Sequence, residues 1–107
     1  MSENPSRREV RATPSFWADL DRQLRDEAGP GGMPPSRSDF LTYDVIQIVE
    51  KFAVGWDDLP TAIPGRDDYR VLISVGRLVP AISVVGQLAP DGAVELVELD
   101  IDTEPLL

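Results

Sequence analysis

The sequence predicts an α+β domain in which two helices pack on one face of a small antiparallel sheet, in the order β-α-α-β-β-β. Two stretches in the first half carry apolar residues at helical spacing, and the last third changes to β-branched residues with a period of two. With 107 residues, of which 42% are hydrophobic, the chain is long enough for one packed core and too short for two domains. We therefore expect residues 8–102 to form a single domain, between a disordered tail at 1–7 and a C-terminal tail at 103–107.

The first strand and the first helix are predicted from one continuous stretch. Residues 8–13 alternate between polar and apolar side chains, as in a short strand. Thr13 and Pro14 then form a helix start, with a hydroxyl N-cap followed by Pro at the first helical position. An apolar stripe at steps of four follows, and Gly29 is suited to a C-terminal cap. We expect a helix over residues 14–28, after which six Gly or Pro among residues 29–37 indicate a loop.

The second helix is predicted over residues 38–54, beginning at Ser38 and ending at Gly55. Its core-facing stripe follows helical spacing and consists of Leu41, Val45, Ile48, Val49 and Phe52. The β-branched run at 45–49 also has strand propensity, but the length of the pattern favours a helix. Residues 56–68 are expected to form a loop whose Trp56, Leu59 and Ile63 pack back onto the core.

Three strands of an antiparallel meander are predicted in the last third, at 69–75, 78–87 and 93–101. Gly76 and Arg77 are expected to make a two-residue reversal, and Pro80 indicates a strand that is bulged or near an edge. Residues 89–92, with the sequence Ala-Pro-Asp-Gly, are a strong turn signal. The last strand should place Val97, Leu99 and Ile101 on one face and Glu98, Asp100 and Asp102 on the other. The strand at 8–12 is expected to join this sheet, because a lone strand is not stable.

Composition excludes several kinds of chemistry. The chain contains no Cys and no His. This excludes disulfides, thiolate chemistry, zinc sites built on these residues, and nucleophiles activated by an imidazole base. No apolar run approaches the roughly 20 residues of a membrane span, and the N-terminus lacks the apolar stretch of a signal peptide. We expect a cytoplasmic protein without a membrane anchor and without a cofactor.

The charge of the chain is unevenly distributed. Residues 1–53 carry seven basic and nine acidic groups, whereas residues 54–107 carry three basic and ten acidic groups. Binding to a phosphate backbone needs clustered Lys and Arg, so we expect no direct nucleic-acid binding by the isolated chain. The acidic half either keeps the protein soluble as a solvated surface or meets a basic protein.

Two stretches carry a resemblance to a known family. EVRATPSFWADLDRQL resembles the opening strand and first helix of the RelE/ParE superfamily of toxin–antitoxin toxins. DDYRVLISVGRLVPAISVVGQLAPDGAVELVELDID resembles its closing meander, including the aromatic–Arg pair Tyr69-Arg70 at the start of a strand. The order of elements matches over residues 8–102. The resemblance implies a growth-inhibiting protein of bacterial type that is neutralised by an antitoxin wrapped around its surface.

The same resemblance implies two modes of action. The ribosome-dependent members are endoribonucleases that cut mRNA with basic and aromatic side chains, which stabilise the charge that develops on the phosphate. Arg70 and Arg77 match sheet positions where the family often has Arg, and they are the candidate catalytic residues. However, the end of the chain, ELDIDTEPLL, offers Asp100, Asp102 and Glu104 where those nucleases carry Arg, His or Tyr. This departure favours the ParE-like branch, whose target is a protein, DNA gyrase, over catalysis.

A second hypothesis comes from the charge alone: a non-enzymatic acidic inhibitor, such as an immunity protein or a nucleic-acid mimic that occupies a basic site. A homodimer formed through the exposed sheet edge is also possible. The structural alternatives for single residues are an ion pair of Arg70 with Asp57, Asp58, Asp67 or Asp68, and an exposed turn position for Arg77. Tyr43 and Tyr69 are expected at the edge of the core, and Trp17 and Trp56 within it. The acidic pairs lack the loop pattern of a calcium site, so no metal site is expected.

Overall fold

Five strands form one mixed sheet in the computed structural model, which describes residues 7–32 and 34–102. The strands lie in the order β1-β5-β4-β3-β2. Their bounds are β1 Val10–Ala12, β2 Thr61–Ile63, β3 Arg66–Ser74, β4 Ala81–Leu88 and β5 Val94–Asp102. β1 is parallel to β5 and every other pair is antiparallel, so the first strand joins the far end of the meander as predicted. Of the expected tails at 1–7 and 103–107, all but Arg7 lie outside the described residues.

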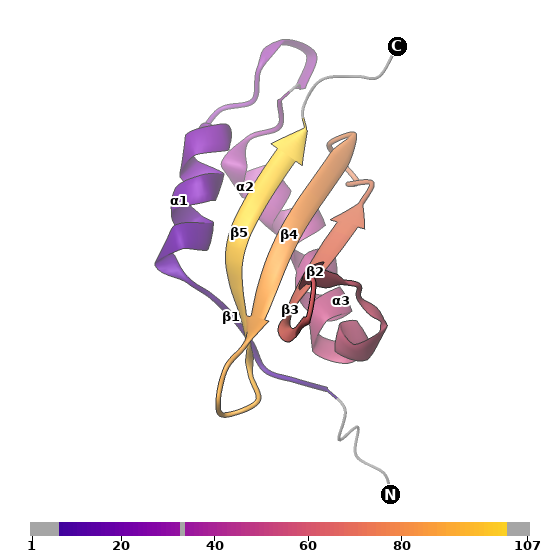
Figure 1. The fold of residues 1–107 in the computed structure, drawn as a ribbon. Coiled ribbons are helices and arrows are strands. Elements are labelled where there is room, and N and C mark those ends of the chain that lie inside the picture. Colours follow the sequence, from indigo (N-terminus) through magenta and orange to yellow (C-terminus); the bar gives the residue numbers. More distant parts are fainter. Residues whose placement is uncertain (1–6, 33, 103–107) are drawn as a thin grey trace, which may run out of the picture.

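Two helical segments cover one face of this sheet and leave the other open (Figure 1). The first is α1 (Pro14–Gln23), and the second consists of α2 (Arg37–Phe40), a π-helical turn η2 (Leu41–Val45) and α3 (Ile46–Gly55). Two short 3₁₀ turns, η1 (Pro30–Gly32) and η3 (Trp56–Asp58), lie in the connections. The predicted α+β class and the packing of two helices on a mostly antiparallel sheet are therefore confirmed.

α1 begins as predicted but ends five residues early. The Thr13 side chain accepts a hydrogen bond from the Phe16 N–H, and Pro14 is the first helical residue. Leu24 leaves the helical conformation with φ −126° and ψ 145°, and its side chain is buried. Residues 25–28 are exposed, so extending the helix through them would bury nothing. Instead, the Arg25 carbonyl accepts a hydrogen bond from the Arg37 N–H at 2.8 Å, which joins the two ends of the connection.

The second helix begins at Arg37, one residue before the predicted start, because Ser36 caps it with a hydrogen bond from the Asp39 N–H. Its buried face overlaps the predicted stripe, of which Ile48 and Phe52 are buried. The buried positions recur every fourth residue: Phe40, Asp44, Ile48, Phe52 and Trp56. In a regular α-helix such positions drift by about 40° per step. The wider π turn at 41–45 offsets part of this drift, and Leu41, Val45 and Val49 of the predicted stripe are half-buried at its flank.

The connection at 56–68 contains a strand that the sequence pattern did not predict. β2 pairs with the start of β3 through a turn in which Gly65 has φ +81°. Trp56 is buried and Leu59 packs against the core, as expected. Ile63 does not, because it lies on the short outer strand and is 42% exposed.

Two details of the meander also differ from the prediction. Residues 75–80 form a longer connection instead of a reversal at Gly76 and Arg77, and Pro80 precedes β4. β4 is an inner strand, and the bulge lies between Val85 and Gly86. Val85 pairs with Glu98 and Gly86 with Leu96, so Val97 is the extra residue on β5. For this reason Leu96, Leu99 and Ile101 face the core, while Val97 is only half-buried.

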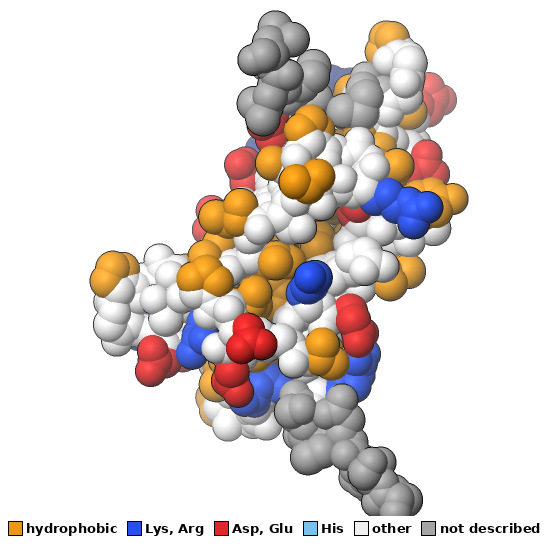
Figure 2. Space-filling model, turned by 90° about the vertical axis from the view of Figure 1, so that its right-hand side faces the viewer, with side chains coloured by type: hydrophobic (Ala, Val, Ile, Leu, Met, Phe, Trp, Pro, Cys, Tyr) orange, Lys and Arg blue, Asp and Glu red, His pale blue; other side chains and the backbone are white. Residues whose placement is uncertain are grey.

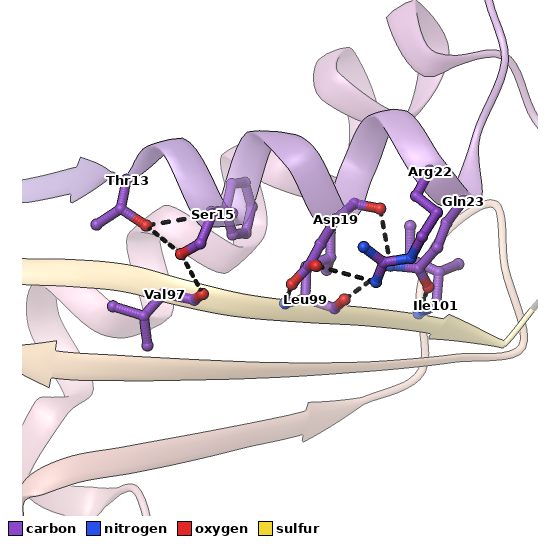
Figure 3. A network of polar contacts seen from close by, with 9 residues as sticks. Thr13, Ser15, Asp19, Arg22, Gln23, Val97, Leu99 and Ile101 are labelled. Atoms are coloured by element: carbon purple, nitrogen blue, oxygen red, sulfur yellow. Dashed lines mark hydrogen bonds and ion pairs between the residues drawn. The ribbon is translucent and has the colours of Figure 1, made fainter.

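The outer edge of β5 is closed in two different ways (Figure 3). β1 covers residues 94–96 with backbone pairing. Beyond them, α1 presents Ser15, Asp19 and Gln23 at steps of four residues. Ser15 Oγ donates to the Val97 carbonyl, Asp19 Oδ2 accepts from the Leu99 N–H, and Gln23 bonds both the Leu99 carbonyl and the Ile101 N–H, at 2.6–3.0 Å. Polar side chains of a helix thus replace a neighbouring strand.

Removing one of these side chains should leave strand groups without partners. We expect Gln23→Leu to lower the free energy of unfolding by about 1–3 kcal/mol, because the Leu99 carbonyl and the Ile101 N–H lose their partners next to the core. Urea denaturation measures this, with exposed Arg25→Ala as the control on the neighbouring turn. Equal stability of the two variants would contradict the assigned role of Gln23.

α3 packs closely against β4 at Gly86, next to the register shift between β4 and β5. A Cβ atom built on Gly86 would lie 2.6 Å from Cε1 of the Phe52 ring, and Phe52 is fully buried. We expect Gly86→Ala to destabilise the fold by about 1–3 kcal/mol through overpacking. Gly55→Ala is the matched control, because a Cβ there meets nothing within 4 Å. Thermal unfolding should separate the two, and a Gly86→Ala variant as stable as the Gly55→Ala variant would contradict the close contact.

Candidate functional site

The guanidinium of Arg70, the first candidate catalytic residue, is hydrogen-bonded to backbone carbonyl oxygens. Nη1 donates to the carbonyl oxygens of Leu59 at 2.8 Å, Trp56 at 3.3 Å and Asp57 at 3.4 Å, and Nε donates to the Asp67 carbonyl at 3.0 Å. The guanidinium also lies 5.5 Å from the centroid of the Trp56 ring. The predicted ion pair with a neighbouring Asp was therefore wrong about the partner, which is backbone carbonyl and not carboxylate. Arg70 stabilises the end of the second helix and the turn that follows it.

Arg77, the second candidate, lies in the 75–80 connection, where it is exposed. Its guanidinium is 5.5 Å from the centroid of the Tyr43 ring, and its backbone N–H donates to Asp44 Oδ1 at 2.6 Å. Arg70 bonds the 56–59 turn and Arg77 stacks on the second helix, so the structure does not bring the two candidates together on a common group.

Asp44 is the buried acidic residue beneath this connection. Its side chain is 3% exposed, and both oxygens accept backbone hydrogen bonds, from the Arg77 and Leu78 N–H groups. The stripe predicted for this helix did not include Asp44, because a carboxylate at a core-facing helical position departs from the apolar periodicity. Two local signals point to it nevertheless. Asp44 is spaced four residues from both Phe40 and Ile48, and the 75–80 connection, which bonds Asp44, contains Gly76.

A cleft of about 260 Å³ opens between α3 and the end of β3. Ile48, Leu72 and Ile82 supply its apolar lining, and Lys51 and Arg77 are its basic residues. Figure 2 views this side of the molecule, where hydrophobic side chains lie in a hollow with a basic side chain beside it. Lys51 is exposed and has no carboxylate partner among the described residues.

The open face of the sheet is acidic on one side and apolar on the other. β5 contributes Glu95, Glu98, Asp100 and Asp102, and the alternation of exposed acids at 98–102 agrees with the prediction. Across the sheet, Glu98 pairs with Val85 and Val85 with Val71. Glu95 lies 3.7 Å from Arg11, whereas Glu98 and Asp100 have no ion pair within the part of the chain that the structure describes. Glu104, the third acid of the predicted series, lies outside the described residues.

The aromatic residues occupy different environments than their types suggested. Trp56 is buried as predicted, but Trp17 is 41% exposed and stacks edge-on against Phe16. Tyr43 is 44% exposed beneath Arg77, and Tyr69 is half-buried beneath Arg66. Trp17 and Tyr43 are therefore more exposed than predicted. Each lies on the outer side of a helix whose inner side supplies the buried core residues.

Residues 7–32 and 34–102 contain neither a metal-ligating cluster nor a membrane-spanning helix. No three carboxylates within these ranges lie close enough together to hold a metal ion. No helix there is both long and apolar enough to cross a bilayer.

The structural role of Arg70 can be tested directly. We expect Arg70→Met to destabilise the protein by about 2–3 kcal/mol, because a charged donor to several carbonyls is lost. Trp56 fluorescence should shift to the red as the turn loosens. Arg66→Met is the control, since Arg66 is exposed and its partners among the described residues are its near neighbours Asp68 and Tyr69. An Arg70→Met variant with unchanged stability and fluorescence would contradict this role.

The Arg11–Asp91 pair, which ties β1 to the β4–β5 turn, should make stability depend on pH. The Arg11 guanidinium, with the Ala93 N–H, holds the pKa of the Asp91 carboxyl below its usual range. A lowered pKa in the folded state stabilises the protein above the unfolded pKa of about 4, and this contribution is lost as pH falls through the folded value.

We therefore expect Arg11→Met to raise the pKa of Asp91 in an NMR titration. The variant should be less stable than the native chain at about pH 6, and the difference should shrink toward about pH 2. A stability difference that stayed constant over this range would show that Arg11 acts through packing instead.

No protein-family model, no curated protein and no solved structure matches this chain. What the structure establishes is a small α+β fold with a five-stranded mixed sheet and two helices. Its described residues leave one sheet face open and form a cleft lined by Lys51, Arg77 and the buried Asp44.

Proposed function

We propose that the chain acts by binding other proteins, as a RelE/ParE-like toxin whose working surface is the open face of its sheet. The observation that carries this proposal is the pair Glu98 and Asp100, two exposed carboxylates without a cationic partner among the described residues, beside the apolar positions Val71 and Val85. A basic, amphipathic segment of an antitoxin complements such a surface in both charge and hydrophobicity.

The chemistry of the site argues for binding over RNA cleavage. Cleavage through a 2′-hydroxyl needs cations placed to stabilise the developing phosphate charge. Arg70 is bonded to four carbonyl oxygens, and Arg77 lies in a different part of the molecule. The carboxylates on the open face would repel a phosphate. The proposed target is therefore a protein, such as DNA gyrase, and no catalytic step is assigned.

The test is controlled expression in bacteria. We expect induction of the native chain to arrest growth, and coexpression of the reading frame next to its gene to restore it. The double variant Glu98→Lys/Asp100→Lys should no longer be neutralised by that partner. Glu27→Lys/Asp39→Lys, which makes the same charge change at exposed helix and loop positions, should be neutralised like the native chain.

Unimpaired growth on induction would overturn the toxin proposal. In that case the same acidic face favours the second candidate, an acidic inhibitor that occupies a basic site. Capture of a nuclease or another basic DNA-handling protein by the native chain, but not by Glu98→Lys/Asp100→Lys, would support it.

A further inference from the structure

The two edges of the sheet differ in how far their backbone N–H and C=O groups are hydrogen-bonded. On the β5 side, β1 and the side chains of α1 bond the backbone groups of residues 94–101. On the other side, β2 pairs only with residues 66–70 of β3, and the Val71 N–H donates to the Pro60 carbonyl at 2.9 Å. Beyond Val71, none of the described residues pairs with the outer edge of β3.

The uncovered end of β3 and the residue that follows it expose apolar side chains. Ile73 and Val75 are 73% and 80% exposed, the two most exposed large hydrophobic side chains among the described residues. Natural proteins usually protect an open edge with Lys, Pro or a bulge, because unpaired N–H and C=O groups accept a further strand. Residues 72–75 carry none of these features. This segment is therefore suited to pairing with an extended chain.

The cleft described above lies directly behind this edge. Ser74 and Val75 line it from the strand side, and Gln47 and Lys51 line it from α3. Its volume of about 260 Å³ is below the roughly 300–1,000 Å³ that accommodates a drug-sized ligand. It is suited to one or two side chains of a peptide that bonds to the strand edge, because alternate side chains of a strand point to the same face.

The charge of the cleft determines which peptide fits. Both oxygens of Asp44 are occupied by the Arg77 and Leu78 N–H groups. Lys51 has no carboxylate partner in the described part of the chain, so the cleft presents a positive charge within a protein of net charge −9. An acidic side chain next to an apolar one complements this site.

We propose that residues 72–74 of β3, the following Val75 and the cleft behind them form a docking site for an extended segment of a partner protein, which pairs as a strand and places apolar and acidic side chains toward Ile48 and Lys51. The inference rests on the proposed function only in that the partner is a protein. The cleft lies on the helix-covered face of the sheet and takes an acidic segment, whereas the open face takes a basic one. Ile73 lies at the margin of the open face, in one row with Ser83 and Asp100, and the double variant at Glu98 and Asp100 separates the two surfaces.

The experiment selects peptides without knowledge of the partner. The probe is a library of linear, randomised heptapeptides displayed on phage, selected against the native full-length chain. We expect enriched peptides with alternating apolar residues and at least one Asp or Glu. Binding of a selected synthetic peptide, measured by fluorescence anisotropy, should weaken at least about tenfold for Lys51→Glu and for Ile73→Lys.

Two controls separate this site from the open face and from a loss of folding. Arg25→Glu, at an exposed site elsewhere, and Glu98→Lys/Asp100→Lys should both bind the peptide like the native chain. Lys51 and Ile73 are exposed, so circular dichroism should show all four variants folded. N-methylation of the peptide amides in one alternating register should abolish binding, and methylation in the other register should not, because only one set of N–H groups faces the edge.

Failure of this inference is distinguishable from failure of the proposed function. A library without enriched peptides would overturn the docking site, as would selected peptides that bind Lys51→Glu and Ile73→Lys unchanged. Selected peptides that lose affinity for Glu98→Lys/Asp100→Lys instead would place binding on the open face and would also overturn it. Absence of growth arrest, by contrast, would overturn only the toxin proposal.

Discussion

The structure depends on satisfying the backbone of β5, the strand that joins the first and last parts of the chain. β5 lies between β4 and β1, but β1 is three residues long and covers only a third of it. Unpaired N–H and C=O groups next to a core are costly. α1 resolves this with Ser15, Asp19 and Gln23, whose spacing of four places them in one row along the strand. The same contacts set how the helix lies on the sheet, because the row that bonds β5 adjoins the row that carries Phe16 and Leu20 into the core.

Some charged side chains stabilise the fold itself, and others are exposed on its surface. Arg70 and Arg11 are engaged in the fold, one with carbonyl oxygens of the 56–59 turn and the other with Asp91 and Glu95. What remains for partners is an acidic open face and a small cleft with Lys51. The acidic face and the cleft lie on opposite faces of the sheet, because the neighbouring residues Val71 and Leu72 of β3 face opposite ways.

Most of the fold followed from local patterns. The capped start of α1, the Asp-Gly turn before β5 and the change from helical to strand periodicity each depend on residues close in sequence. Three features could not be predicted in this way. The end of α1 at Gln23 reflects a hydrogen bond between Arg25 and Arg37. β2 exists because β3 offers it an edge, and the buried Asp44 is acceptable because the Arg77 and Leu78 N–H groups reach it.

The sequence alone determined the fold class, the absence of Cys and His chemistry, and the excess of negative charge in the second half of the chain. Each is a property of composition or of short-range periodicity. Only the tertiary structure decided that Arg70 is structural, that Val97 leaves the core face at a bulge, and that one edge of the sheet is closed while the other is open. These outcomes depend on which distant groups meet, since a guanidinium or a strand edge is free for function only when no other part of the chain uses it.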